Sequence, residues 1–137
     1  MGRASGVLMA VSSLPNSYGI GTFGKEAYDF IDFLVRTKQR YWQVLPLTTT
    51  SYGDSPYQSF SAAAGSPYYI DLKDLEKLGY LKSDDFEDIS FGTSNTCVDY
   101  GALFVNHRRL LNRAFDRFVQ DVPADFEKFC HDQAEWL

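Results

Sequence analysis

The first fifty residues show two different spacings of apolar positions. The apolar run from Gly6 to Val11 (GVLMAV) is typical of a buried strand. From Gly24 the apolar positions recur every three or four residues, which predicts an amphipathic helix with Thr22 as its N-cap. The expected apolar face of this helix consists of Ala27, Phe30, Ile31, Leu34 and Val35. The run from Tyr41 to Leu47 (YWQVLPL) predicts a second strand, and the three elements together predict a β-α-β unit with parallel strands.

Residues 48–70 (TTTSYGDSPYQSFSAAAGSPYYI) interrupt this regular pattern. They are rich in Ser, Gly, Pro and aromatic residues, which is typical of turns. Loops of this length are usually functional or disordered, and the aromatic content favours an ordered loop. Residues 71–81 then predict one or two helical turns closed by Gly79, and residues 83–96 predict an acidic surface stretch.

Helical spacing returns in the last forty residues. A long helix is predicted from about Asp99, with Tyr100, Leu103, Phe104, His107, Leu111, Ala114, Phe115 and Phe118 on one face. Pro123 interrupts it. A last helix is predicted from near Ala124, with Phe126, Phe129 and Cys130 on its face, and it runs into Trp136-Leu137 without a stop signal. We therefore expect a chain that is cut rather than finished, with too few strands to cover both faces of a parallel sheet.

Composition narrows the class of protein. The length of 137 residues fits one globular domain, and the formal net charge of -5 argues against a nucleic-acid partner, which would require clustered Lys and Arg. The only cysteines, Cys97 and Cys130, lack metal-ligand spacing, which favours a reducing, cytoplasmic location and no metal site. No apolar run is long enough for a membrane span, so no membrane partner is expected.

The segment from Gly19 to Gly24 (GIGTFG) has the G-x-G-x-x-G spacing of dinucleotide-binding loops. That motif requires a strand directly before it, but residues 12–18 intervene after the first predicted strand. The second predicted strand ends in Thr48-Thr49-Thr50, without the acid that would bind a ribose. The simpler interpretation is that these glycines shape a loop and a helix entry, and a nucleotide-binding fold is kept as the weaker alternative.

The long loop is the candidate site, because ligands of α/β folds bind at the carboxyl ends of strands. The candidate residues of the loop are Tyr52, Asp54, Ser55, Tyr57, Gln58 and Ser59. Such polar and aromatic side chains suit a sugar, because its C–H faces stack on aromatic rings and its hydroxyls form hydrogen bonds. In the alternative interpretation Tyr57, Phe60, Tyr68 and Tyr69 only pack the loop, and Asp54 only forms a turn. His107 is expected to be a partly buried packing residue, and neither it nor His131 has the neighbours of a nucleophilic triad.

Three segments carry a resemblance to a known family. RASGVLMAVSSLPNSYGIGTFG, YWQVLPL and YGDSPYQSFSAAAGSPYYIDL resemble the amino-terminal part of the amylomaltase, or 4-α-glucanotransferase, family of α-glucan-active barrels. The resemblance runs from about Arg3 to Leu81 and continues more weakly through VDYGALF. SLPNSYGIGTFG and YGDSPYQSFSA are its most diagnostic parts. In this family the glycines after SLP shape the loop between the first strand and the first helix, and they bind no cofactor.

The resemblance implies an α/β fold, namely the N-terminal part of a (β/α)8 TIM barrel with a helical insertion. The chain would hold the first two strands and the first helix, and the barrel would be incomplete, because one takes at least ~200 residues. Residues 1–47 would form the first β-α-β unit, residues 48–82 the substrate-binding loop and a short helix, and residues 83–137 the helical insertion.

The resemblance also implies an activity. Family members transfer an α-1,4-glucan segment to the 4-hydroxyl of an acceptor glucan or glucose with retention, through an Asp nucleophile, a Glu acid/base and a further Asp. These carboxylates lie downstream in the family and match no position here, so no catalytic residue is assigned. Tyr57 resembles a tyrosine beside the sugar at the cleavage subsite, Ser55 a serine that hydrogen-bonds substrate, and Tyr52 an aromatic at an outer glucan site. Asp54 and Gln58 belong to the same loop with less defined roles.

Two departures from the family pattern and one alternative complete the expectations. Lys38 stands where many members have glycine after the first helix, and Ala63 stands where some have a larger aromatic residue. The chain alone is expected to be inactive, and its residues do not separate transfer from hydrolysis. The alternative from a different class is a non-catalytic module that binds maltooligosaccharides through the loop from Tyr52 to Tyr57.

Overall fold

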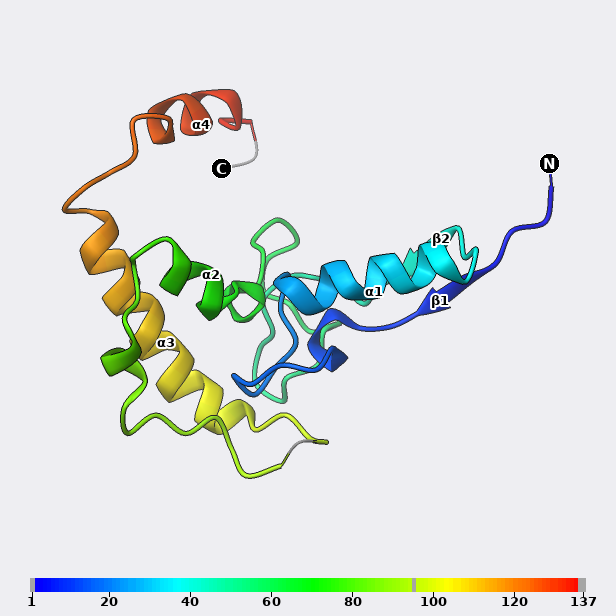
Figure 1. Cartoon of the computed structure of the whole chain (residues 1–137), viewed down its shortest axis with the longest axis horizontal. Coiled ribbons are helices and arrows are strands. Elements are labelled where there is room, and N and C mark those ends of the chain that lie inside the picture. The colour runs from blue at the N-terminus through cyan, green and yellow to red at the C-terminus, as the bar shows by residue number, and fades with distance from the viewer. Residues whose placement is uncertain (1, 95, 136–137) are drawn as a thin grey trace.

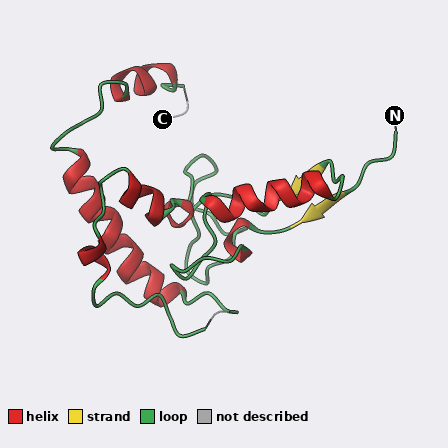
Figure 2. Ribbon diagram, in the orientation of Figure 1, coloured by secondary structure: helices red, strands yellow, loops and turns green. Residues whose placement is uncertain are grey.

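The computed structural model describes residues 2–94 and 96–135. Two short strands, β1 (Gly6–Leu8) and β2 (Tyr41–Gln43), flank helix α1 (Lys25–Arg36) in the sequence. Three further helices follow, α2 (Leu72–Lys77), α3 (Tyr100–Phe118) and α4 (Phe126–Asp132). Helix α1 lies with the strand pair at one end of the molecule and α3 at the other, with α2 between them (Figure 1). Long loops occupy the centre, as Figure 2 shows.

The strands confirm the predicted β-α-β unit. β1 and β2 are parallel neighbours, with Val7 opposite Trp42 in the register. Both strands are shorter than the apolar runs that predicted them. After β1 the chain turns into a 3₁₀ turn, η1 (Val11–Ser13), and β2 ends at Gln43, three residues before Pro46, which has no N–H to donate to a ladder.

Helix α1 packs on the strand pair through a narrower face than its sequence predicts. Ala27 and Leu34 are buried, and the Phe30 ring meets the Trp42 ring edge-on at 5.0 Å. Ile31 and Val35, expected on the same face, are exposed, Val35 by 69%. Two strands cover only a strip of the helix, so its outer apolar positions stay exposed.

The predicted N-cap of α1 is wrong. Gly24 occupies the N-cap position in extended conformation and makes no side-chain cap. Thr22 is fully buried instead, and its hydroxyl donates a hydrogen bond to the Asp71 carboxylate. The Thr22 hydroxyl, which the sequence pattern predicted to cap the helix, is therefore used in a contact with the distant residue Asp71.

Helices α1 and α2 end in the same motif. After α2, Gly79 adopts φ 81° and donates to Glu76, while Tyr80 donates to Leu75, as predicted for a glycine closing this helix. After α1 the corresponding left-handed position is Lys38, with φ 59°. Its N–H donates to Val35 at 3.1 Å, and the Gln39 N–H donates to Leu34 at 2.9 Å. The position of Lys38 therefore has the backbone geometry that favours glycine.

A hydrophobic cluster joins α2 to α3. Its buried members are Leu72, Leu81, Leu110 and Ala114. The predicted face of α3 is partly wrong, because Leu110 is fully buried while Phe104 is 60% exposed and Phe115 is exposed as well. Helix α3 has apolar residues on several sides, and packing against α2 selects which of them become core.

The predicted acidic surface stretch contains a buried carboxylate. Asp85, at the end of the 3₁₀ turn η3 (Ser83–Phe86), is buried and accepts hydrogen bonds from both terminal nitrogens of Arg117 on α3. Arg113 donates to the Asp85 backbone carbonyl at 2.8 Å. The hydrogen bond from Arg117 lowers the pKa of Asp85 from 3.8 to about 2. This ion pair fixes the segment before α3 against the helix.

Helix α4 stands apart from the rest of the chain (Figure 1). Its Phe126 ring meets the Phe118 ring of α3 at 5.0 Å. The helix ends at Asp132, and Trp136-Leu137, toward which it was predicted to run, lie outside the described residues.

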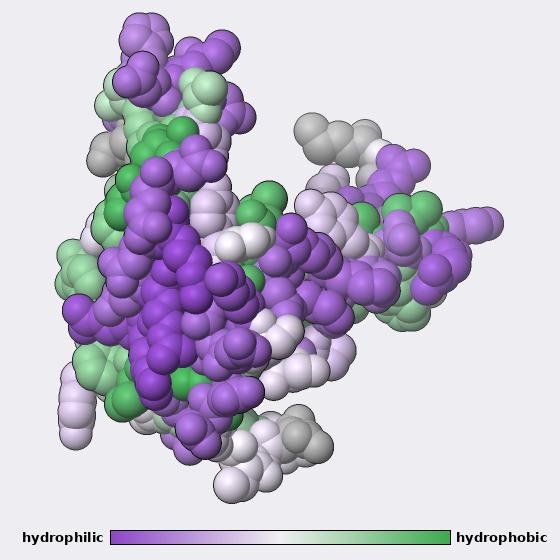
Figure 3. All heavy atoms as spheres, turned by 60° about the vertical axis from the view of Figure 1, so that its left-hand side comes forward, coloured by the Kyte–Doolittle hydropathy of each residue, from purple (hydrophilic) through white to green (hydrophobic). Residues whose placement is uncertain are grey.

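Across the described part of the chain, no helix combines the length and apolar character needed to cross a membrane. Figure 3 shows mainly hydrophilic side chains on the α3 side, with hydrophobic ones in separate patches.

Candidate functional site

Residues 48–70 form an ordered loop, held at its base by backbone hydrogen bonds. Thr48 pairs with Gly65 in an isolated antiparallel bridge, and the Ser66 N–H donates to Leu47 at 2.9 Å. Inside the loop, the Ser51 N–H donates to Gln58 at 3.0 Å and closes the turn that carries the candidate residues. The loop directly follows the carboxyl end of a parallel strand, where α/β proteins place their ligands.

Asp54 and Ser55 have structural roles in this turn. Asp54 adopts φ 57°, and its N–H donates to Ser51 at 3.1 Å, so Asp54 forms a turn in addition to any role in binding. The Ser55 hydroxyl accepts from the Tyr57 N–H at 3.3 Å. Tyr52 is fully exposed and Tyr57 is 73% exposed. Tyr57 therefore does not pack the loop down, and both rings are free to contact a ligand.

A cavity of about 1080 Å³ lies between this loop and the start of α3. The candidate residues Tyr52 and Asp54 line it, together with residues 49–51, Gly53, Phe60, Ser66, Pro67, Tyr68, Tyr100, Gly101, Phe104, His107, Arg108, Leu111 and Asn112. Ser55, Tyr57 and Gln58 are not among the lining residues. Ser59 is not among them either, so the structure brings two of the six candidate residues to the cavity.

Sequence reasoning missed the α3 side of the cavity. Tyr100, His107 and Arg108 face it from the helix, about fifty residues beyond Tyr52 in the chain. The Tyr68 ring connects the two sides, since it lies 6.2 Å from the Tyr100 ring and 5.7 Å from the His107 ring. Helical spacing placed Tyr100 and His107 on a core face, and only the tertiary arrangement shows that this face borders a cavity.

His107 is buried more completely than predicted. Its side chain has no exposed area, and neither ring nitrogen has a hydrogen-bond partner within residues 2–94 and 96–135. Burial lowers the pKa of His107 from 6.5 to about 4, against an opposing effect of the Asp71 carboxylate. The imidazole is therefore neutral at neutral pH, with one donor and one acceptor nitrogen.

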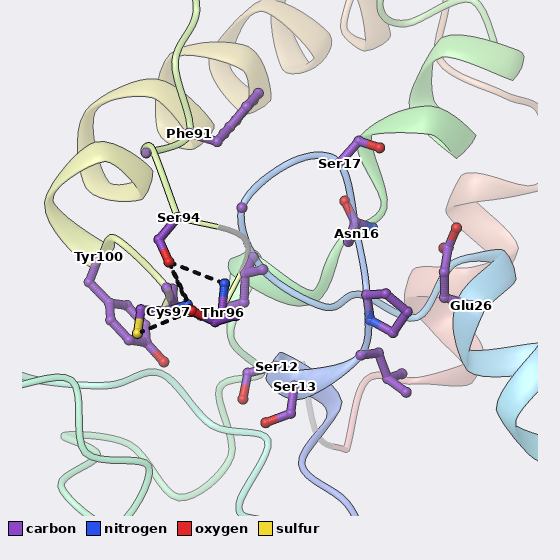
Figure 4. A pocket seen from close by; sticks show the side chains of 16 residues that line it. Ser12, Ser13, Asn16, Ser17, Glu26, Phe91, Ser94, Thr96, Cys97 and Tyr100 are labelled. Atoms are coloured by element: carbon purple, nitrogen blue, oxygen red, sulfur yellow. Dashed lines mark hydrogen bonds between the residues drawn. The ribbon is translucent and has the colours of Figure 1, made fainter.

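A second cavity, of about 1090 Å³, adjoins the glycine-rich segment (Figure 4). Ser12 and Ser13 contribute hydroxyls from the turn after β1, and Ser94 and Thr96 contribute them from the segment before α3. Glu26 of α1 lies on the opposite side, and neither Lys nor Arg is among the described lining residues. A polar lining with a carboxylate and no cation is unsuited to a pyrophosphate.

Close backbone contacts explain the G-x-G-x-x-G spacing. Gly19 adopts φ 82°, a Cβ at Gly21 would overlap the Val11 carbonyl, and a Cβ at Gly24 would overlap the Asp71 carboxylate. An acid of the chain itself therefore lies at the N-cap of α1, the end of a helix where a nucleotide phosphate would bind. These contacts argue against the nucleotide-binding alternative and agree with glycines that shape a loop.

Asp71 connects the glycine-rich segment to the long loop. Its carboxylate accepts hydrogen bonds from Thr22 and, at 3.4 Å, from Asn16, and it caps α2 by accepting from the Asp74 N–H at 3.0 Å. Nearby, the Phe23 N–H donates to the Tyr69 carbonyl at 3.1 Å. The two segments that follow the carboxyl ends of β1 and β2 are thereby held in one arrangement.

Metal and thiol chemistry have little support in the described structure. Over residues 2–94 and 96–135, no group of three or more His, Cys, Asp or Glu side chains is placed to hold a metal ion. Cys97 is exposed and Cys130 is partly buried, and both are free thiols. Cys97 lines the second cavity, and no Lys, Arg or His that could activate a thiol is among the described lining residues.

The parallel β-α-β unit and the two linked loops that follow the carboxyl ends of its strands define an α/β protein. Residues 9–137 match the sequence model of the family described as 4-alpha-glucanotransferase, so the chain belongs to that family. It is 58% identical over 137 residues to the 4-alpha-glucanotransferase of Streptococcus pneumoniae, a match covering 98% of this chain and 27% of the relative. It is 46% identical over 139 residues to that of Thermus thermophilus, with the same coverage.

A solved structure agrees with this assignment. The chain superposes on the amylomaltase from Streptococcus agalactiae, determined in complex with acarbose, with a TM-score of 0.89 and 50% sequence identity. The superposition covers 97% of this chain and 27% of that structure. The chain thus spans about 27% of the length of the relatives that it matches.

Proposed function

We propose that the chain is the amino-terminal part of a 4-α-glucanotransferase. The complete enzyme transfers an α-1,4-glucan segment to the 4-hydroxyl of an acceptor glucan or glucose with retention. Family membership supports this activity, as does the similarity to an amylomaltase determined with acarbose. The observation that carries the proposal is the cavity between Tyr52 and Tyr100, whose aromatic and hydroxyl lining suits a neutral sugar.

In the proposed fold, β1, α1 and β2 are the first elements of a (β/α)8 barrel, and α3 and α4 belong to an insertion. The surface supports an incomplete assembly, because the chain exposes 9902 Å² and a compact monomer of 15.6 kDa exposes roughly 7300 Å². Part of the excess is apolar, including Val35 on α1 and Tyr41 on β2. Further strands and helices of a barrel would cover these positions.

The proposed role of this chain is glucan binding. Tyr52 presents a fully exposed ring at the edge of the cavity, and Tyr68 and Tyr100 offer rings along its wall. Apolar C–H faces of glucose stack on such rings, while Asp54 and Arg108 are placed to hydrogen-bond hydroxyls. Tyr57, Ser55 and Gln58, which do not line the cavity, are proposed to contact the sugars next to the scissile bond.

The chemical step requires groups that this chain does not supply. A retaining enzyme uses two carboxyl groups ~5–5.5 Å apart, one as nucleophile and one as acid/base. We assign these groups to the part of the enzyme beyond these residues. The choice of a sugar acceptor over water depends on how that site excludes water from the intermediate. A cytoplasmic location is part of the proposal, in keeping with two free cysteines.

The test uses maltotriose as sole substrate. The product of the uninterrupted reading frame is expected to convert it into glucose and a ladder of longer maltooligosaccharides, followed by chromatography. The 137-residue chain alone is expected to leave maltotriose unchanged. If the longer protein binds maltooligosaccharides without converting them, the non-catalytic module replaces the transferase, and an absence of both binding and conversion rejects glucan chemistry altogether.

A further inference from the structure

His107 is a polar group without a visible role at the wall of the proposed glucan cavity. It lines the cavity, yet both ring nitrogens lack a partner among the described residues and the side chain has no exposed area. Buried polar side chains in proteins are nearly always hydrogen-bonded, because an unpaired one lowers the stability of the fold. An unpaired imidazole therefore points to a partner that is absent from the free chain.

The surroundings limit what that partner can be. The nearest ring is Tyr68, 5.7 Å away and nearly perpendicular, and the nearest charge with a resolved effect on the imidazole is the Asp71 carboxylate. Asp71 already accepts hydrogen bonds from Thr22, Asn16 and the Asp74 N–H. His107 borders the cavity but has no exposed area, so the neighbouring Tyr68 ring has to move before a ligand can meet its one donor and one acceptor nitrogen.

We propose that His107 is a specificity-determining residue that hydrogen-bonds a hydroxyl of a glucan bound in this cavity. The inference rests on the proposed function, since it takes the cavity to be a glucan site. A sugar hydroxyl both donates and accepts, so it can pair with either nitrogen of the neutral ring. Because the ring is covered in the free chain, the bound glucan reaches it only if the half-buried Tyr68 ring, which packs edge-on against it, swings away from the imidazole.

The proposal predicts opposite effects of one substitution on stability and on binding. In the complete enzyme, His107→Phe keeps an aromatic ring against Tyr68 but removes both unpaired nitrogens. The melting temperature of the free enzyme is expected to rise, because no polar group stays unpaired. The affinity for maltoheptaose, measured by calorimetry, is expected to fall about tenfold, the effect of losing one hydrogen bond.

Three further variants make the test decisive. His131→Phe is the matched control, since His131 is exposed and is not among the lining residues, and it should change neither quantity. His107→Gln retains a donor and an acceptor and should recover most of the affinity. Tyr52→Ala tests the cavity itself and should weaken binding independently of His107.

Each outcome decides between the two claims. If Tyr52→Ala weakens binding and His107→Phe does not, the inference about His107 is wrong and the glucan cavity stands. If neither variant weakens binding, the cavity is not a glucan site and the role proposed for it fails as well. If His107→Phe lowers both the melting temperature and the affinity, and His107→Gln recovers neither, the ring serves packing alone.

Discussion

At the scale of single residues, burial of a titratable group makes stability depend on pH. The folded pKa of His107 is about 4 and its ordinary value is 6.5, so between these values the unfolded chain binds more protons than the folded one. Stability therefore increases with pH across this window and is lost on acidification. The loss reaches roughly 3 kcal/mol at pH 4 if the whole shift is expressed.

His107→Phe is accordingly expected to flatten this part of the pH profile. Denaturant unfolding between pH 4 and pH 7 would show a smaller acid loss for the variant, and a gain of ~1–3 kcal/mol at pH 7 from removing unpaired groups. Asp85, whose folded pKa is about 2, titrates mainly below this range and gives both proteins the same background. Parallel pH profiles for the two proteins would contradict the assigned pKa.

Tyr57 permits a second prediction for a single side chain. Because the ring is 73% exposed, Tyr57→Ala in the complete enzyme is expected to change stability by less than ~0.5 kcal/mol. The transfer rate on maltotriose should fall at least severalfold, and Tyr57→Phe, which keeps the ring for stacking, should retain most of it. If the transfer rate is unchanged, or if a loss of stability accounts for the lower rate, Tyr57 does not contact the substrate.

At the scale of elements, the two helix ends provide a matched pair. Helices α1 and α2 close with the same hydrogen bonds, but the left-handed residue is Lys38 in one and Gly79 in the other. The left-handed conformation costs a residue with a side chain roughly 1–2 kcal/mol, and glycine avoids this cost. Part of the gain, ~0.5–1 kcal/mol, is lost because glycine has more conformational freedom in the unfolded chain. The helix ends therefore differ in stability for a reason local to one residue.

Lys38→Gly is expected to stabilise the complete enzyme by ~0.5–1 kcal/mol, and Gly79→Lys is expected to destabilise it by a similar amount. Thermal or denaturant unfolding measures both. Lys38 is exposed, and its hydrogen bond to Val35 comes from the backbone N–H, which glycine also has. Equal stabilities of Lys38→Gly and the parent enzyme would indicate that side-chain interactions of Lys38 offset the backbone strain.

The elements also show what the sequence alone could predict. The β-α-β unit, the ordered loop and the glycine at the end of α2 follow from local patterns and were confirmed. The core face of α3 could not be predicted fully, because Leu110 and Phe104 are both apolar. Packing against α2 buries Leu110 and leaves Phe104 exposed. Thr22 was misassigned for a similar reason, since its partner Asp71 lies 49 residues away. The α3 side of the cavity depends on the same distant contacts.

At the scale of the whole molecule, the chain exposes more surface than its mass requires. The apolar outer positions of α1 and the sheet face that carries Leu8 and Tyr41 are exposed in the described structure. Exposed parallel strands and apolar patches favour association with other surfaces. The folded state of this region is therefore expected to depend on the remainder of the enzyme.

The 137-residue chain produced alone should bind the dye ANS and unfold over a broad temperature range, and the complete enzyme should do neither. Calorimetry and dye fluorescence on the two proteins compare them directly. The comparison is fair only for monomers, so sedimentation should accompany it. A sharp transition of the isolated chain without dye binding would show that the packing within these residues is enough for a cooperative fold.

The contact between Gly24 and the Asp71 carboxylate also constrains how this sequence can drift. A side chain at position 24 would overlap that carboxylate, so such a mutation arising first damages the fold. Replacement of Asp71 by a smaller residue opens the space, at the expense of its hydrogen bonds to Thr22 and Asn16. Position 71 therefore has to change before position 24. Among proteins descended from this sequence, those with a side chain at position 24 and an unchanged Asp71 should be rare.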